Sequence, residues 1–272
     1  MINLNYIIWA LIATLYAPTF YFLYRSGWEY IDYTHAYFIL PVSLGLIWYK
    51  RAYLKKAFDK SIPTVVSKTG LALFIASAAL FIIGYRNGFN FIATFSLIPL
   101  LFGLSLYLYG RKVTRALVFP FSYLFLLVPI PSGILDSITV PMRYGISVLT
   151  EIILKTFNYP ITREGLLLKL RSHEIYMGAP CSGFRSLITM ISLGLVYVYL
   201  SKNNRKNKIL LLSSIIPFAL IGNLIRVVSM CLVTFYFGDS IGQKYHDISG
   251  YMIFVFLILG LVGLEALLNK RK

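Results

Sequence analysis

Residues 69–85 read TGLALFIASAALFIIGY, and residues 91–109 read FIATFSLIPLLFGLSLYLY. Neither run contains a charged residue, and as a helix each would be about 25–29 Å long. A helix needs roughly 20 apolar residues to cross the ~30 Å hydrocarbon core of a bilayer. Both runs are therefore predicted to be transmembrane helices.

Similar runs recur along the whole chain, which is 58% hydrophobic and only 13% charged. That is too little charge to cover a soluble domain of this length. The predicted helices span residues 6–24, 35–49, 69–85, 91–109, 116–130, 183–200, 209–237 and 248–268. We expect an all-α polytopic integral membrane protein of about eight transmembrane helices, forming one domain over residues 1–272. Residues 6–24 lack a preceding basic region and a small-residue cleavage site, so they are predicted to be a retained helix rather than a signal peptide.

The net charge of +16 does not indicate a nucleic-acid partner, because the charge is sorted by loop. Four connections carry 16 of the 26 Lys and Arg residues, and they are residues 50–68, 111–115, 202–208 and 270–272. Only two of the ten acidic residues, Asp59 and Glu265, lie in or beside them. The connections alternate along the chain, as the positive-inside rule requires of cytoplasmic loops, and do not form a phosphate-binding surface.

The charge pattern also predicts the topology in the cell (cytoplasmic or inner) membrane. Placing the four basic connections in the cytoplasm lets all eight helices alternate in direction, with both termini cytoplasmic. Residues 131–182 are then the one long external segment. A multi-pass protein with an outward-facing site is the expected arrangement.

The external segment contains a predicted amphipathic helix and a short hairpin. Polar side chains recur every four residues, at Arg143, Ser147, Glu151 and Lys155, and apolar residues fill the other side. Such a helix is expected to lie in the outer interface of the membrane. After Pro160, residues 166–170 and 174–177 predict a short β-hairpin.

Cys181 lies in the stretch GAPCSGFRS, residues 178–186, at the external start of the sixth predicted helix. Pro180 and the following Ser-Gly pair indicate a helix start. There the helix dipole and Arg185, one turn later, would both favour a thiolate. A small residue in a tight entry turn is the alternative interpretation. Cys181 is therefore a candidate nucleophile.

The second cysteine, Cys231, is predicted to be structural. It follows Arg226 by five residues, which places it about 140° around the helix, against lipid or a neighbouring helix. A Cys181–Cys231 disulfide is the alternative and would remove the nucleophile. Two cysteines exclude a disulfide framework and a multi-cysteine metal site, and no cofactor or metal is expected.

Arg226 lies within the predicted helix 209–237, roughly 25 Å from its start. Inserting an arginine into a membrane costs about 2.5–3.5 kcal/mol on translocon scales, so such a residue is a functional hypothesis by default. Asn223, three residues earlier, shares its face of the helix. The alternative is that Arg226 extends to the outer head groups.

His246 and Asp247 lie at the external entrance of the last predicted helix. A histidine at such a position is by itself more often an ordinary loop residue. The remaining histidines, His35 and His173, also fall on the external side, so either could serve as a base in place of His246. Asp247 could orient the imidazole.

The predicted topology brings Cys181, Arg226 and His246 from three helices to the outer surface. Together they suit acyl transfer, in which a thiolate attacks a carbonyl, an imidazole moves protons and a guanidinium binds the developing oxyanion.

These motifs resemble those of the exosortase/archaeosortase family. The matching stretches are Cys181–Ser186, Asn223–Val227, and His246 with Gly250. Weaker matches are Asp32–His35 followed by Pro41, and Leu127–Pro131 ahead of Asp136. The resemblance covers nearly the whole chain with order and spacing preserved.

The resemblance implies a membrane transpeptidase. Family members recognise a C-terminal signal on other membrane-anchored proteins, made of a short PEP-CTERM-like motif, a hydrophobic span and a basic tail. They cleave at the motif and transfer the protein to another anchor, for which a lipid, a glycan or water is the acceptor here. By position, Cys181 would be the nucleophile, Arg226 the oxyanion or substrate-positioning group, and His246 the acid/base. Supporting or substrate-binding roles would fall to Arg185, Asn223, Asp247 and His35.

Within the family, His246 favours the bacterial exosortase type, because the archaeal branch often has arginine there. Ala36 departs from that type, in which glycine commonly follows the histidine at position 35. Two other functions remain open from the residues alone. One is a polytopic transporter in which Arg226 and His246 bind an anion or relay protons. The other is a non-catalytic factor for envelope assembly or export.

Overall fold

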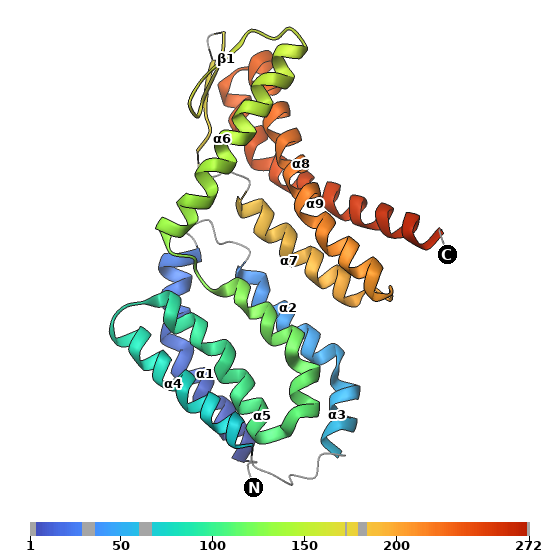
Figure 1. The fold of residues 1–272 in the computed structure, drawn as a ribbon. Helices are drawn as coiled ribbons and strands as arrows, with labels where there is room; N and C mark the ends of the chain where they lie inside the picture. The colour runs from blue at the N-terminus through green and yellow to red at the C-terminus, as the bar shows by residue number, and fades with distance from the viewer. Residues whose placement is uncertain (1–3, 29–35, 60–66, 172, 179–183, 271–272) are drawn as a thin grey trace. The chain divides into compact units, whose positions relative to one another are not determined.

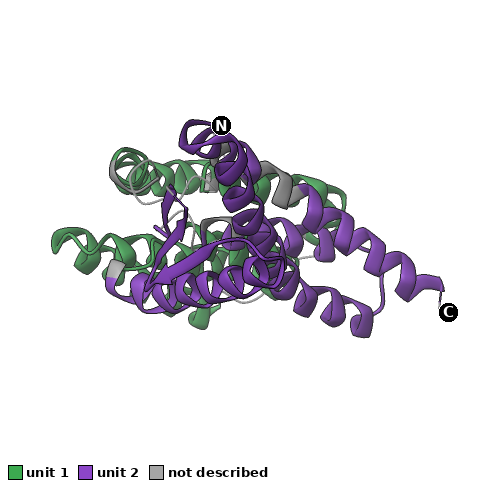
Figure 2. Cartoon of the chain, turned by 90° about the horizontal axis from the view of Figure 1, so that it is seen from above, with its two compact units in different colours: residues 1–131 green, residues 132–272 purple. Residues whose placement is uncertain are grey.

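The computed structural model describes residues 4–28, 36–59, 67–171, 173–178 and 184–270. Contacts divide the chain into two compact units, residues 1–131 and 132–272 (Figure 2). Nearly all of both units is helical, and each is described by itself. The predicted all-α polytopic membrane fold is confirmed.

Unit 1 consists of helices only among its described residues. They are α1 (Leu4–Phe22), a π-helical turn η1 (Leu23–Trp28), α2 (Ala36–Tyr49), α3 (Arg51–Asp59), α4 (Lys68–Arg86), α5 (Asn90–Tyr123) and a 3₁₀ turn η2 (Leu124–Leu127). Within α5, Gly110 has φ 75° and ψ 178°, which is not helical. The chain turns back at this point (Figure 1). The predicted runs 91–109 and 116–130 therefore form separate helices, the second of which ends at Leu127.

The helix pair α4–α5 is held by close backbone contact. A Cβ added to Gly70 would lie 2.7 Å from the backbone nitrogen of Tyr107, and one added to Gly103 would lie 2.6 Å from that of Phe74. Small residues that let two backbones approach are typical of packing between membrane helices. α2 packs along the second half of α5, where Ser43 Oγ donates to the carbonyl of Pro120 at 2.8 Å.

Most basic residues of unit 1 gather at one end of it, and the exceptions are Arg25 after α1 and Arg86 in the last turn of α4. The start of α1, the helix α3 and the turn at Gly110 all lie at this end (Figure 1). Lys50, just before α3, donates from Nζ to the carbonyl of Ala116 at 2.9 Å. Ala116 lies in the second half of α5, directly after the basic residues of 111–115. The arrangement agrees with the charge pattern, and the membrane side of this end stays a prediction.

Unit 2 combines helices with a small sheet. Its elements are α6 (Ser132–Thr156), β1 (Ile161–Glu164), β2 (Leu167–Leu170), β3 (His173–Tyr176), α7 (Phe184–Leu200), α8 (Arg205–Phe237) and α9 (Asp239–Lys270). α8 packs along α9, and α7 packs on both.

The three strands form an antiparallel sheet in the order β1-β2-β3. Leu168 pairs with Arg163 on one side and with Ile175 on the other. Gly165, with φ +61°, makes the first turn. The predicted hairpin is thus confirmed as β2 and β3, and β1 is a strand that the sequence did not show. Leu168 and Leu170 are fully buried in a cluster shared with α6 and α8.

The predicted amphipathic helix is confirmed as α6, but its polar side faces the protein. Arg143 and Ser147 are buried, whereas Ile138, Tyr144 and Ile152 are 43–54% exposed. An exposed apolar side suits contact with lipid. α6 is also long and apolar enough to cross a membrane, so its expected position in the outer interface stays a prediction.

Five described helical segments are long and apolar enough to span a bilayer. They are Tyr6–Arg25, Lys68–Arg86, Asn90–Leu127, Gly133–Thr156 and Arg205–Phe237, with shorter apolar helices at Ala36–Tyr49 and Leu187–Leu200. Each of the eight runs predicted from the sequence is helical in its described residues, except that the run 116–130 leaves the helical conformation after Leu127. The chain is a multi-pass membrane protein, and the count of eight crossings stays a prediction.

Candidate functional site between α8 and α9

Arg226 is buried where α8 packs against α9. Its side chain is 9% exposed, and Nε donates to Ser249 Oγ at 3.1 Å. Ser249 belongs to α9 and is itself 1% exposed. The guanidinium therefore lies inside unit 2, which does not fit an arginine that extends to the head groups.

A cavity of about 230 Å³ surrounds this contact. Its lining is Gly222, Ile225, Arg226, Ser229, Tyr245, Ser249 and Phe256. Tyr245 donates from its hydroxyl to Ser229 Oγ at 2.9 Å, and Ser229 Oγ donates to the main-chain oxygen of Arg226 at 2.9 Å. One guanidinium and three hydroxyls thus share a small cavity with an otherwise apolar wall.

The predicted partners of Arg226 are partly within the described structure. Asn223 is 2% exposed and lies one turn before Arg226 in α8, as predicted. His246 and Asp247 lie in α9 between Tyr245 and Ser249, both of which line the cavity, although the side chains at 246 and 247 are outside the described part. The structure therefore brings Asn223, Arg226 and the α9 turn that carries His246 together.

Cys181 and His35 lie outside the described residues, and Arg185 is described only as a position in the first turn of α7. The chain before the cysteine segment is anchored near Arg226, because Met177 is fully buried in a cluster with Val227 and Met230.

α7 packs against α8, because a Cβ on Gly194 would lie 2.5 Å from Cδ1 of Ile215 on α8. In the first turn of α7, Leu187 packs against the cluster that contains Ala219 of α8 and Leu257 of α9. The described residues on both sides of segment 179–183 therefore pack against the elements of unit 2.

His173, the alternative base, is placed elsewhere. Its Nδ1 lies 2.9 Å from Oδ1 of Asp239, the first residue of α9. Asp239 precedes His246 by seven residues, which is about 10 Å along the helix. His173 does not line the cavity, and its contact ties β3 to the start of α9.

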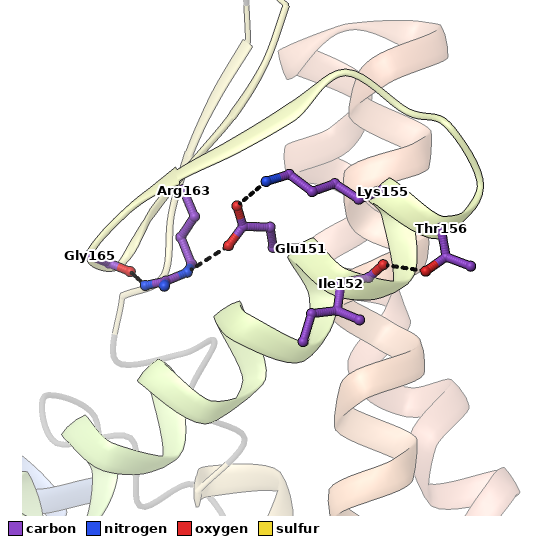
Figure 3. A network of polar contacts seen from close by, with 6 residues as sticks. All are labelled: Glu151, Ile152, Lys155, Thr156, Arg163 and Gly165. Atoms are coloured by element: carbon purple, nitrogen blue, oxygen red, sulfur yellow. Dashed lines mark hydrogen bonds and ion pairs between the residues drawn. The ribbon is translucent and has the colours of Figure 1, made fainter.

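The polar side of α6 contacts the sheet through Glu151. Arg163 on β1 donates from Nε to Glu151 Oε2 at 2.9 Å and from Nη1 to the carbonyl of Gly165 at 3.0 Å (Figure 3). Lys155 binds the other carboxylate oxygen of Glu151 at 2.8 Å. The Glu151 carboxylate raises the pKa of Arg163 by accepting its hydrogen bond. Glu151 and Lys155 are thus assigned to the α6–β1 contact.

Cys231 is fully buried in the cluster of Val227 and Met230, so it packs against neighbouring elements as expected. Within the described ranges, no group of three or more His, Cys, Asp or Glu residues could hold a metal ion.

The sequence did not single out Ser229, Tyr245 or Ser249. The only available signal was spacing, since Ser229 follows Arg226 by three residues, Tyr245 precedes His246 and Ser249 follows His246 by three.

Comparison with known proteins gives one match. The family model described as transmembrane exosortase matches residues 28–263, a range that runs through both units. No curated protein and no solved structure matches the chain.

Proposed function

Because the chain belongs to the transmembrane exosortase family, we propose that it is a cysteine transpeptidase acting on other membrane-anchored proteins. It would cleave a C-terminal sorting signal, made of a short motif, a hydrophobic span and a basic tail, and transfer the protein to another anchor. The observation that carries this proposal is the buried Arg226, which lines a cavity beside the turn of α9 that carries His246.

The first half of the reaction forms a thioester. The Cys181 thiolate attacks the carbonyl carbon of the scissile peptide bond, and the carbonyl oxygen becomes negatively charged. Arg226 binds this oxyanion. When it collapses, the C–N bond breaks and the leaving amine takes a proton from the protonated His246.

The second half releases the product. A hydroxyl or amine of the acceptor, or water, attacks the thioester carbonyl while His246 takes its proton. The C–S bond then breaks, and Cys181 leaves as the thiolate beside a protonated His246. The enzyme is thereby restored to its starting state.

The environment of Arg226 supports the role of oxyanion partner. A guanidinium in a largely apolar cavity interacts with a developing charge much more strongly than it would in water. Its contact with Ser249 means that little reorganisation is needed when the charge forms. Asn223, buried one turn earlier, is proposed to support the same region of α8.

The start of α7 supports the role of Cys181. α7 begins three residues after Cys181, and we propose that its N-terminus and Arg185 in the first turn both favour the thiolate. Asp247 is proposed to orient His246, and His35 to contribute to the substrate-binding side. The site would face outward, with the substrate's basic tail on the same side of the membrane as the four basic connections.

The test compares the two cysteines. The probe is an epitope-tagged membrane protein of the source organism that ends in a hydrophobic span and a basic tail, scored by the ratio of full-length to processed protein. Cys181→Ala should abolish processing with normal enzyme level, since the covalent path is gone. Cys231→Ala should still process, because Cys231 is fully buried in an apolar cluster and is proposed to have no role in the covalent path. Wild-type processing by Cys181→Ala would refute the covalent mechanism, whereas a transporter would leave processing unchanged in both variants.

A further inference from the structure

We infer that Ser249 is the positioning residue for Arg226, fixing the plane and direction of its guanidinium relative to α9. This inference rests on the proposed function of Arg226. Its starting observation is the 3.1 Å hydrogen bond from Arg226 Nε to Ser249 Oγ, between two side chains that are 9% and 1% exposed.

The bond to Nε has a specific geometric consequence. All five N–H groups of a guanidinium lie in one plane at fixed angles, so holding Nε–H in one direction also sets the direction of the other four. An oxyanion partner works only if its donors point at the place where charge develops. Ser249 therefore fixes the orientation of Arg226, as a hydrogen-bonded carboxylate often fixes the orientation of a functional histidine.

The position of Ser249 couples the two helices of the site. Ser249 follows His246 by three residues in α9, less than one turn. Holding the α8 arginine at Ser249 therefore fixes the arginine relative to the turn that carries the proposed acid/base. A guanidinium hydrogen-bonded only to residues of α8 would not be fixed relative to the turn of α9 that carries His246.

A second contact braces the main chain of the same turn. Tyr245 donates to Ser229 Oγ, which donates to the carbonyl oxygen of Arg226. The two contacts differ in kind, because the Ser229 bond holds the backbone of Arg226 and the Ser249 bond orients its charged group. Only the second is expected to affect the chemical step directly.

The first experiment removes the Ser249 hydroxyl. Ser249→Ala should lower kcat roughly tenfold, the effect of one hydrogen bond to a charged group, with KM unchanged. Ser249→Thr keeps a hydroxyl and should retain most of the activity. The matched control is Ser147→Ala, because Ser147 is fully buried in the same unit and its hydroxyl donates to Tyr144 of its own helix. If Ser249→Ala has the kcat of Ser147→Ala, the inference is wrong.

A double-mutant cycle separates positioning from a general packing role. Lysine has no Nε–H group to hold, so in an Arg226→Lys background Ser249→Ala should cause little further loss, measured under single-turnover conditions. Equal tenfold losses in both backgrounds would show an independent packing role and overturn the inference. The proposed function is tested separately by the same assay. If Cys181→Ala and Arg226→Ala both process normally, the proposed function itself fails.

Discussion

The two units bury different kinds of polar side chain. Among the described residues, the buried polar side chains of unit 1 other than tyrosine are serines and threonines, and most of their hydroxyls bond to main-chain oxygens, as those of Ser77 and Thr94 do within their own helices. Unit 2 buries Asn223 and two arginines, Arg143 and Arg226. Burying an arginine in a membrane protein is costly, so it is expected where the charge is used. We therefore propose that the chemical step takes place in unit 2 and that the helices of unit 1 mainly support the fold.

The units also differ in how their helices are joined. In unit 1 the pair α4–α5 meets through glycines that leave no room for a side chain. In unit 2, α8 and α9 also meet closely at Gly242, but around Arg226 they are joined by hydrogen bonds beside a cavity. The first arrangement gives a rigid contact, and the second leaves space beside a charged group. The following predictions test this contrast.

The largest expected effect is in the topology of unit 2, because each of its ends should report either wholly cytoplasmic or wholly external. The α7–α8 connection and the end of α9 lie together, because Glu265 accepts hydrogen bonds from Tyr197, Ser201 and Asn203. The sheet lies at the opposite end of α8. A topology reporter fused near Arg205 should therefore read cytoplasmic, and one at Glu164 should read external. A cytoplasmic result at Glu164 would place the site on the wrong side for the proposed reaction.

The next effect compares the two buried arginines. Arg226→Lys keeps the positive charge but loses the planar guanidinium with its N–H groups in fixed directions. Processing should therefore fall roughly 10²–10³-fold, which corresponds to about 3–4 kcal/mol in the activation barrier. Arg143 is equally buried but bonds to Thr139 of its own helix and lies 3.7 Å from Asp136. Arg143→Lys should therefore process close to wild type. The measurement is the ratio of full-length to processed substrate, normalised to enzyme level.

Two results would contradict this assignment. Wild-type ratios in Arg226→Lys and Arg226→Ala would remove Arg226 from the site and leave Cys181 and His246 without an electrophilic partner. A loss in Arg143→Lys as large as in Arg226→Lys would mean that buried charge in unit 2 is needed in general, not at one cavity.

The helices were predictable from the sequence because hydrophobic length is a local property. The runs at 91–109 and 116–130 were separable since Gly110 and the basic residues after it interrupt the apolar pattern. β1 was missed because its four residues, Ile161–Glu164, include only one apolar side chain, and the sequence does not show its pairing with β2. The periodicity of α6 showed two faces but could not show which one the protein covers.

At the site, the sequence indicated Arg226 and Asn223 because polar residues within an apolar helix are conspicuous. It did not indicate Ser249, since serine is common in membrane helices and forms no pattern by itself. Only the packing of α8 on α9 brings its hydroxyl to the guanidinium. Pairing between distant helices is the information that a single sequence lacks.

The smallest effect concerns the glycines of unit 1, and it tests whether the helix pair α4–α5 acts only as a support. Gly103→Ala would place a Cβ 2.6 Å from the backbone nitrogen of Phe74, which cannot move aside as a flexible side chain could. The resulting overpacking should cost about 1–3 kcal/mol of stability.

The control is Gly45→Ala in α2, where a Cβ would meet nothing within 4 Å. There alanine should be neutral or stabilising by about 0.5–1 kcal/mol, because alanine loses less backbone conformational entropy than glycine when it enters a helix. The two substitutions are chemically identical, so an opposite sign can come only from the close contact between α4 and α5. The measurement is the midpoint of thermal unfolding in detergent, together with the processing rate per folded enzyme. Gly103→Ala should lower the midpoint and leave that rate unchanged. If the rate falls while the midpoint holds, the helix pair α4–α5 affects the reaction directly, and its assignment as a structural support is wrong.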